Sequence, residues 1–174
     1  MYFWHIKKVN TKKVNFPKQT DFCTFAVQNE NMGRILAIDY GQKRVGLAVT
    51  DPLQIAANGL DTISVSEVLD YLKRYIEKEP IEKFVVGLPK QMNGEDSDSM
   101  QFIRPFVENL RRKFPNIELV YVDERFTSIL AHKAMLEGGL KKKDRQNKGL
   151  VDKISATIIL QTYLETIRHS MSIG

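Results

Sequence analysis

Short apolar segments that alternate with amphipathic ones constrain the fold of this chain more than any other feature. Five strand-like runs, bounded by glycine and proline, cover residues 34–39, 43–51, 59–63, 83–89 and 117–122. The first three follow one another closely, as in an antiparallel meander, and helical patterns separate the last two. This order predicts an α/β fold, with a mixed five-stranded sheet and helices on both of its faces.

Four segments have the pattern of helices. The first follows Ser66 and ends before Pro80, and the second covers residues 102–110, with Pro105 as a kink or a first-turn residue. The third, residues 128–139, ends in two glycines. The last, residues 149–167, is apolar almost all round, so we expect it to pack against the sheet.

The first 32 residues differ from the rest of the chain. They show neither alternation nor a helical stripe, and they lack the continuous apolar core of a secretory signal. Because Met32 directly precedes a strong strand, we expect translation to start there and residues 1–32 to be an extension. Residues 33–169 are then one domain and residues 170–174 a tail.

Cysteine content and hydropathy favour a reducing compartment. The single Cys23 cannot form an internal disulfide, and no apolar run approaches the roughly 18 residues that a membrane span requires. The sequence therefore predicts a cytoplasmic protein that does not enter a membrane.

The net charge of +5 is unevenly distributed. Residues 1–32 contribute +3 of it and leave +2 for the rest of the chain, so any polyanion site must come from local clusters. Such clusters lie beside the candidate acids described below, and residues 141–153 hold six cations against two acids. The predicted phosphate contacts are Lys43, Arg44, Lys90, Arg125 and Lys148. A solvated lysine-rich loop is the alternative interpretation.

Asp39 is the acid that ends the first strand. A carboxylate at the end of a central, buried strand is costly unless it is paired or bound to a metal. The alternative is a hairpin turn, in which Asp39 and Gly41 form the bend and the cations that follow are solvated.

Two further positions supply acids. Asp123 and Glu124 follow the fifth strand, and because neighbouring strand residues point to opposite faces, at most one of them readily joins Asp39. Asp152 lies in the last helix, where Ser155 and Ala156 would let the helix approach the sheet closely. The simpler alternatives are a solvated strand end and an acid that complements the helix dipole.

Together these acids indicate a metal site. Carboxylates that converge repel one another unless a divalent cation lies between them, and oxygen ligands favour magnesium or manganese. Three histidines and one cysteine, in no zinc-like spacing, make a zinc enzyme a poor fit.

Five motifs occur in a characteristic order: DYG at 39–41, KRVGLAVTD at 43–51, VVGLP at 85–89, VDERFTS at 122–128 and VDKISATIIL at 151–160. In this order the chain, from about Gly33 to Leu164, resembles the YqgF/RuvX family, described as Holliday-junction-resolvase-like proteins or nucleases for the 16S rRNA precursor. The resemblance implies a ribonuclease H-like fold, a bacterial cytoplasmic setting and a divalent-metal nuclease site. It places the catalytic, metal-binding acids at Asp39, Glu124 and Asp152, with Asp123 in reserve.

We therefore expect hydrolysis of a phosphodiester bond in precursor rRNA, with ribosomal assembly intermediates as partners. A DNase acting on Holliday junctions is a variant that requires a dimer with two sites, and the sequence does not reveal the oligomeric state. A non-catalytic ribosome-assembly or transcription factor could keep the same fold. A sugar-kinase or actin-like nucleotide binder fits poorly, because the 174-residue chain leaves 142 residues after Met32 and those proteins need a second domain.

Overall fold

The computed structural model describes residues 33–89, 99–123, 135, 138–139, 143 and 147–172. Its elements, in chain order, are β1 (Arg34–Tyr40), β2 (Arg44–Thr50), β3 (Ala57–Ser64), α2 (Val68–Ile76), β4 (Ile81–Leu88), α3 (Met100–Lys113), β5 (Glu118–Asp123) and α6 (Lys148–Ser172). The predicted α/β class and the order of the five strands are confirmed.

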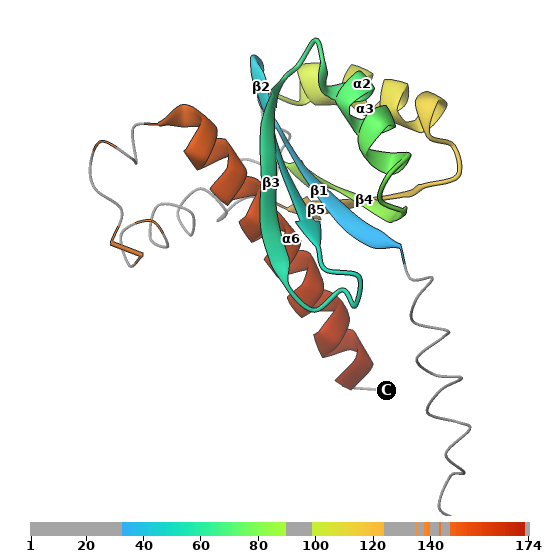
Figure 1. Ribbon diagram of the computed structural model, residues 1–174, viewed down its shortest axis with the longest axis vertical. Helices are drawn as coiled ribbons and strands as arrows, with labels where there is room; N and C mark the ends of the chain where they lie inside the picture. The colour runs from blue at the N-terminus through green and yellow to red at the C-terminus, as the bar shows by residue number, and fades with distance from the viewer. Residues whose placement is uncertain are drawn as a thin grey trace, which may run out of the picture. The chain divides into compact units, whose positions relative to one another are not determined.

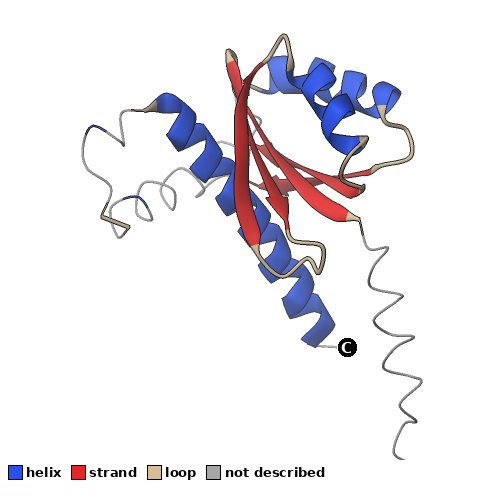
Figure 2. Ribbon diagram, viewed as in Figure 1, coloured by secondary structure: helices blue, strands red, loops and turns tan. Residues whose placement is uncertain are grey.

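The five strands form one mixed sheet, drawn in red in Figure 2. Its strand order is β3-β2-β1-β4-β5, with antiparallel pairing from β3 to β1 and parallel pairing from β1 to β5. The antiparallel half is the predicted meander. The crossover through α2 places β4 beside β1, so β1 is central and the carboxyl ends of β1, β4 and β5 share one edge of the sheet.

Each face of the sheet is covered by helix, with α2 and α3 on one side and α6 on the other (Figure 1). Alternation along the strands supplies both cores. In β4, Phe84 and Val86 pack beneath α2 and α3, whereas Val85 packs against α6. Burial on both faces therefore explains the unbroken apolar pattern of this strand.

Helix limits differ from the sequence predictions in detail. Pro105 lies inside α3, and α6 is longer at both ends than the predicted residues 149–167. The helix predicted over residues 128–139 lies mostly outside the described residues. None of the helices in the described ranges is long and apolar enough to cross a membrane.

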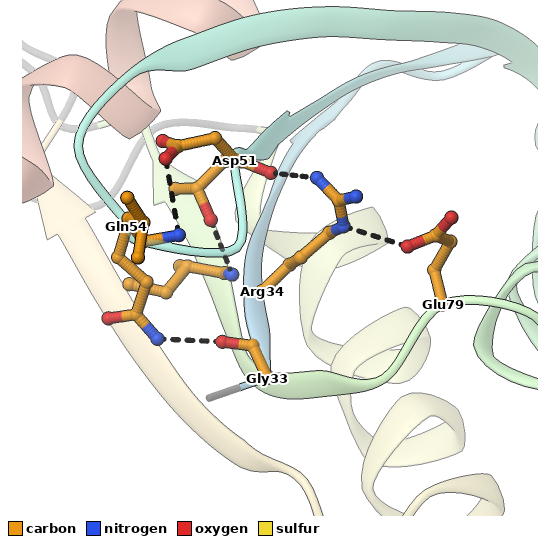
Figure 3. Close-up of polar contacts among 8 residues, drawn as sticks. Gly33, Arg34, Asp51, Gln54 and Glu79 are labelled. Atoms are coloured by element: carbon orange, nitrogen blue, oxygen red, sulfur yellow. Dashed lines mark hydrogen bonds and ion pairs between the residues drawn. The ribbon is translucent and has the colours of Figure 1, made fainter. Parts of the chain in front are cut away.

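Polar contacts fix the edge of the sheet where β1 begins (Figure 3). The Arg34 Nε donates to Glu79 at 2.9 Å, and its NH1 donates to the Thr50 carbonyl, also at 2.9 Å. In the turn after β2, the Asp51 carboxylate accepts hydrogen bonds from the backbone N–H groups of Leu53, Ile55 and Ala56. Side chains thus close the β2–β3 connection at the end of β1 opposite Asp39.

Asp51→Ala should lower the free energy of unfolding by about 1–2 kcal/mol, because three backbone donors lose a charged acceptor near the surface. Desolvation raises the pKa of Asp51, but those donors outweigh it and hold the pKa below its ordinary value. The contribution is therefore present above pH 4 and is lost as the pH falls through the lowered pKa. Urea unfolding at pH 7 measures it. Asp70→Ala, at an exposed aspartate of α2, is the matched control, and equal effects of the two substitutions would contradict the assignment.

Candidate active site

Asp39 lies next to the last residue of β1, on the face covered by α6. Ile35 and Ala37 precede it on that face and are buried against the helix. Burial, and secondarily the negative charge of Asp152, raise the pKa of Asp39 from 3.8 to about 7. Two acids 113 positions apart in the chain therefore lie close enough to repel one another, and Asp39 is more than part of a hairpin turn.

Gly46 allows the α6 backbone at Asp152 to approach the sheet beside Asp39. It pairs with Asp39 across the β1–β2 ladder, so the two residues share a face. A Cβ built on Gly46 would lie 2.1 Å from the backbone oxygen of Asp152 and 3.3 Å from its Cα. The α6 backbone thus rests directly on the sheet where β2 has no side chain, one strand away from Asp39.

The first turn of α6 is anchored to the outer strand β3. The Thr62 hydroxyl donates to the Gly149 carbonyl at 2.7 Å, and the Asn147 side chain accepts a hydrogen bond from the Leu150 N–H. Since the helix begins at Lys148, Asp152 is its fifth residue and the first turn contains no acid. Interaction with the helix dipole therefore does not explain Asp152.

Arg44 forms an ion pair with Asp152. Its Nε lies 2.7 Å from Asp152 Oδ2, and both side chains are partly exposed. Arg44 is two residues before Gly46 in β2 and therefore lies on the same face. The predicted phosphate contact is thus directly joined to a predicted metal ligand.

The other residues predicted to contact phosphate or metal are only partly described by the structure. Lys43 is exposed in the turn between β1 and β2, and Lys148 is exposed at the start of α6. Lys90, Glu124 and Arg125 lie outside the described residues.

Asp123 is placed on the other face of the sheet from Asp39. It pairs with Leu88, which packs into the core beneath α2 and α3, whereas Val122 packs into the core beneath α6. The structure therefore brings Asp39 and Asp152 together and does not bring Asp123 to them.

A divalent cation fits the chemistry of this pair. Within the described ranges no three acid, histidine or cysteine side chains gather as a complete metal site, so the pair could hold a cation only together with further ligands. Both are carboxylates, the ligand type that magnesium and manganese prefer, and Asp39 is destabilised in its ionised form by its surroundings.

Sequence reasoning missed three residues that build this site: Gly46, Thr62 and Asn147. A glycine inside an apolar strand is a signal of close backbone approach, and Gly46 could have been found in that way. Thr62 and Asn147 also line a hollow of about 320 Å³ between β3 and the start of α6, and no local pattern marks them.

This sheet, with one acid at the end of its central strand and another on the last helix, belongs to the ribonuclease H-like class. A solved structure of that fold, "T. thermophilus RuvC in complex with Holliday junction substrate", matches with a TM-score of 0.50 and 14% identity, over 77% of this chain and 96% of that one. The chain belongs to the RuvX family, described as Holliday junction resolvase, whose model matches residues 33–166.

Close relatives share most of this chain. A protein of Phocaeicola vulgatus is 64% identical over 138 residues, which are 79% of this chain and 99% of the relative. A protein of Bacteroides thetaiotaomicron is 62% identical over 137 residues, with the same coverage of both chains. Both are named "Putative pre-16S rRNA nuclease".

Proposed function

We propose that this chain is a divalent-metal-dependent nuclease that hydrolyses phosphodiester bonds in the precursor of 16S rRNA. The observation that supports this best is the juxtaposition of Asp39 and Asp152, which repel one another strongly enough to contribute to the raised pKa of Asp39. A dication between them would remove that repulsion. The same juxtaposition disfavours a binding protein without catalysis, which would have no need to keep two acids together.

Asp39 and Asp152 would hold magnesium or manganese, with Glu124 as a third ligand. The alternation of β5 argues against Asp123, because Val122 packs on the α6 face and Asp123 therefore points to the other face. Glu124 is the acid that the family motif names. When bound, such an ion activates water and stabilises the charge that develops on the phosphate and its leaving oxygen. The carboxylates would orient the reacting groups around the ion.

Basic residues around the acids would hold the nucleic-acid backbone. Lys43 and Lys148 are exposed at the edge of the sheet where β1 ends and at the start of α6, and Lys90 and Arg125 are further candidates by sequence. These contacts bind phosphate without reading sequence, so binding should weaken steeply with salt.

The names of the relatives favour RNA over DNA as the substrate. Two relatives above 60% identity are named for the 16S rRNA precursor, whereas the family description names Holliday junctions. Processing of rRNA would place the protein in the cytoplasm with ribosomal assembly intermediates. We retain residues 33–169 as the nuclease domain, with an extension at 1–32. The predicted tail at 170–174 is shorter than expected, because α6 continues through Ser172.

The test is magnesium-dependent cleavage of a precursor 16S rRNA fragment by the purified full chain. Asp39→Asn and Asp152→Asn should each reduce the rate on the order of 100-fold, because each removes a charged ligand. Asp70→Asn, on the exposed side of α2, should cleave at the wild-type rate. Unchanged cleavage by Asp39→Asn would overturn the assignment, and cleavage of a Holliday junction without cleavage of the RNA would favour the resolvase alternative.

A further inference from the structure

Arg44 uses its Nε for Asp152, and this contact determines what the residue can do. The Nε lies 2.7 Å from Asp152 Oδ2, so the arginine binds one oxygen of a carboxylate that we assign to the metal site. This hydrogen bond uses Oδ2, so Oδ1 is the oxygen of Asp152 that a cation would take. A carboxylate can serve an arginine and a metal ion at once, one through each oxygen.

Stability does not explain the pair. The side chain of Arg44 is 39% exposed and that of Asp152 is 26% exposed. Ion pairs with this much solvent access contribute little to folding, since water screens the attraction and two long side chains lose freedom. We therefore look for the role of this ion pair in the position and orientation that it gives the Asp152 carboxylate.

The backbone of Arg44 is fixed in the sheet, so its side chain can orient the Asp152 carboxylate. Its carbonyl accepts a hydrogen bond from Gly41 at 2.9 Å, which closes the turn from β1, and Arg44 pairs with Ser64 of β3. The guanidinium thus extends from a fixed point of the sheet, close to the strand end that carries Asp39. Asp152 belongs to a helix whose backbone touches the sheet at Gly46, and the hydrogen bond from Arg44 ties its carboxylate to the same strand.

We propose that Arg44 is a positioning residue for the divalent-cation site: it holds the Asp152 carboxylate in the orientation that lets Asp152 and Asp39 bind one ion. The proposal rests on the proposed nuclease function. It differs from a phosphate contact, the role that the sequence favoured, because it acts through Asp152 and requires no nucleic acid.

The two effects of removing Arg44 on cation affinity have opposite signs. Loss of a positive charge near the site would by itself tighten the binding of a dication. Loss of the partner that orients a metal ligand weakens metal binding, by 10–100-fold in typical cases. A weaker affinity in Arg44→Gln therefore reports positioning and cannot come from the charge.

The experiment is titration of the full chain with Mn²⁺ by electron paramagnetic resonance, and with Mg²⁺ by calorimetry, without nucleic acid. Arg44→Gln should raise the dissociation constant about 10–100-fold, and Arg44→Lys should lie between it and wild type. In the Asp152→Asn background, Arg44→Gln should have no further effect. Lys43→Gln removes the neighbouring positive charge and should leave the dissociation constant unchanged or slightly lower.

The outcomes separate this role from the proposed function. If wild type binds neither cation, both are rejected. If wild type binds and Arg44→Gln binds equally or more tightly, only the positioning role is rejected. A shallower salt dependence of RNA binding with unchanged metal affinity would likewise assign Arg44 to phosphate. Circular dichroism in chelator checks folding, and if Arg44→Gln is unfolded, Arg44→Lys decides, because it keeps the charge and loses the Nε.

Discussion

Gly46→Ala is expected to destabilise the protein by about 3 kcal/mol and to abolish cation binding, although it adds one methyl group. The new Cβ would lie 2.1 Å from the Asp152 backbone oxygen and 2.6 Å from its carbonyl carbon. Neither atom can move unless the α6 backbone moves, so the helix must lift from the sheet or the strand must bend. Urea unfolding in chelator measures the stability, and a manganese titration measures the site.

Gly59→Ala is the matched control for this substitution. Gly59 also faces α6, but its new Cβ would meet the Lys153 side chain, at 2.6 Å from Cγ and 2.9 Å from Cδ. A lysine side chain can shift, so we expect a change within about 1 kcal/mol and normal cation binding. Equal behaviour of the two variants would show that α6 does not rest on Gly46.

Asp39→Asn should make the protein more stable than wild type in the presence of chelator, by roughly 4 kcal/mol at pH 8. The pKa of Asp39 is about 7 in the folded protein against a value near 3.8 in the unfolded chain. Between these values the folded state binds more protons than the unfolded state, so the stability of wild type falls as the pH rises from about 4 to 7 and then levels off. Chemical unfolding of both proteins at each pH measures the difference.

Asp152→Asn provides the comparison for the pH profile. Burial is the larger cause of the raised pKa and the charge of Asp152 the smaller, so removing that charge should recover only part of the stability. At pH 4, Asp39→Asn and wild type should be nearly equal. A difference between them that is the same at every pH would contradict the assignment. Magnesium should stabilise wild type and leave Asp39→Asn almost unaffected.

The fold was predictable because its signals are local. Short apolar runs and glycine or proline breaks marked the five strands, and the apolar character of residues 149–167 predicted a helix against the sheet. Small residues on that helix predicted a close approach, and Ala156 is indeed fully buried. Gly46, the sheet residue that α6 approaches, was not predicted, because a glycine in a strand is weak evidence of close packing unless the facing helix is known.

The site was predictable only in outline. Asp39 and Asp152 could be named from strand end, helix face and family motif. The bond between Arg44 and Asp152 joins residues 108 positions apart, and no pattern in either segment specifies a pair. The exclusion of Asp123 depends on strand parity, which is set by whether Val122 faces α6, a property of the folded sheet.

The contact between β1 and α6 also sets the time at which the site can exist. Asp39 is made 113 positions before Asp152, which lies in α6. A chain truncated before α6 lacks both Asp152 and the ion pair with Arg44. Until α6 has been made and has packed on the sheet, Asp39 therefore has no acidic partner, and the proposed cation site cannot form.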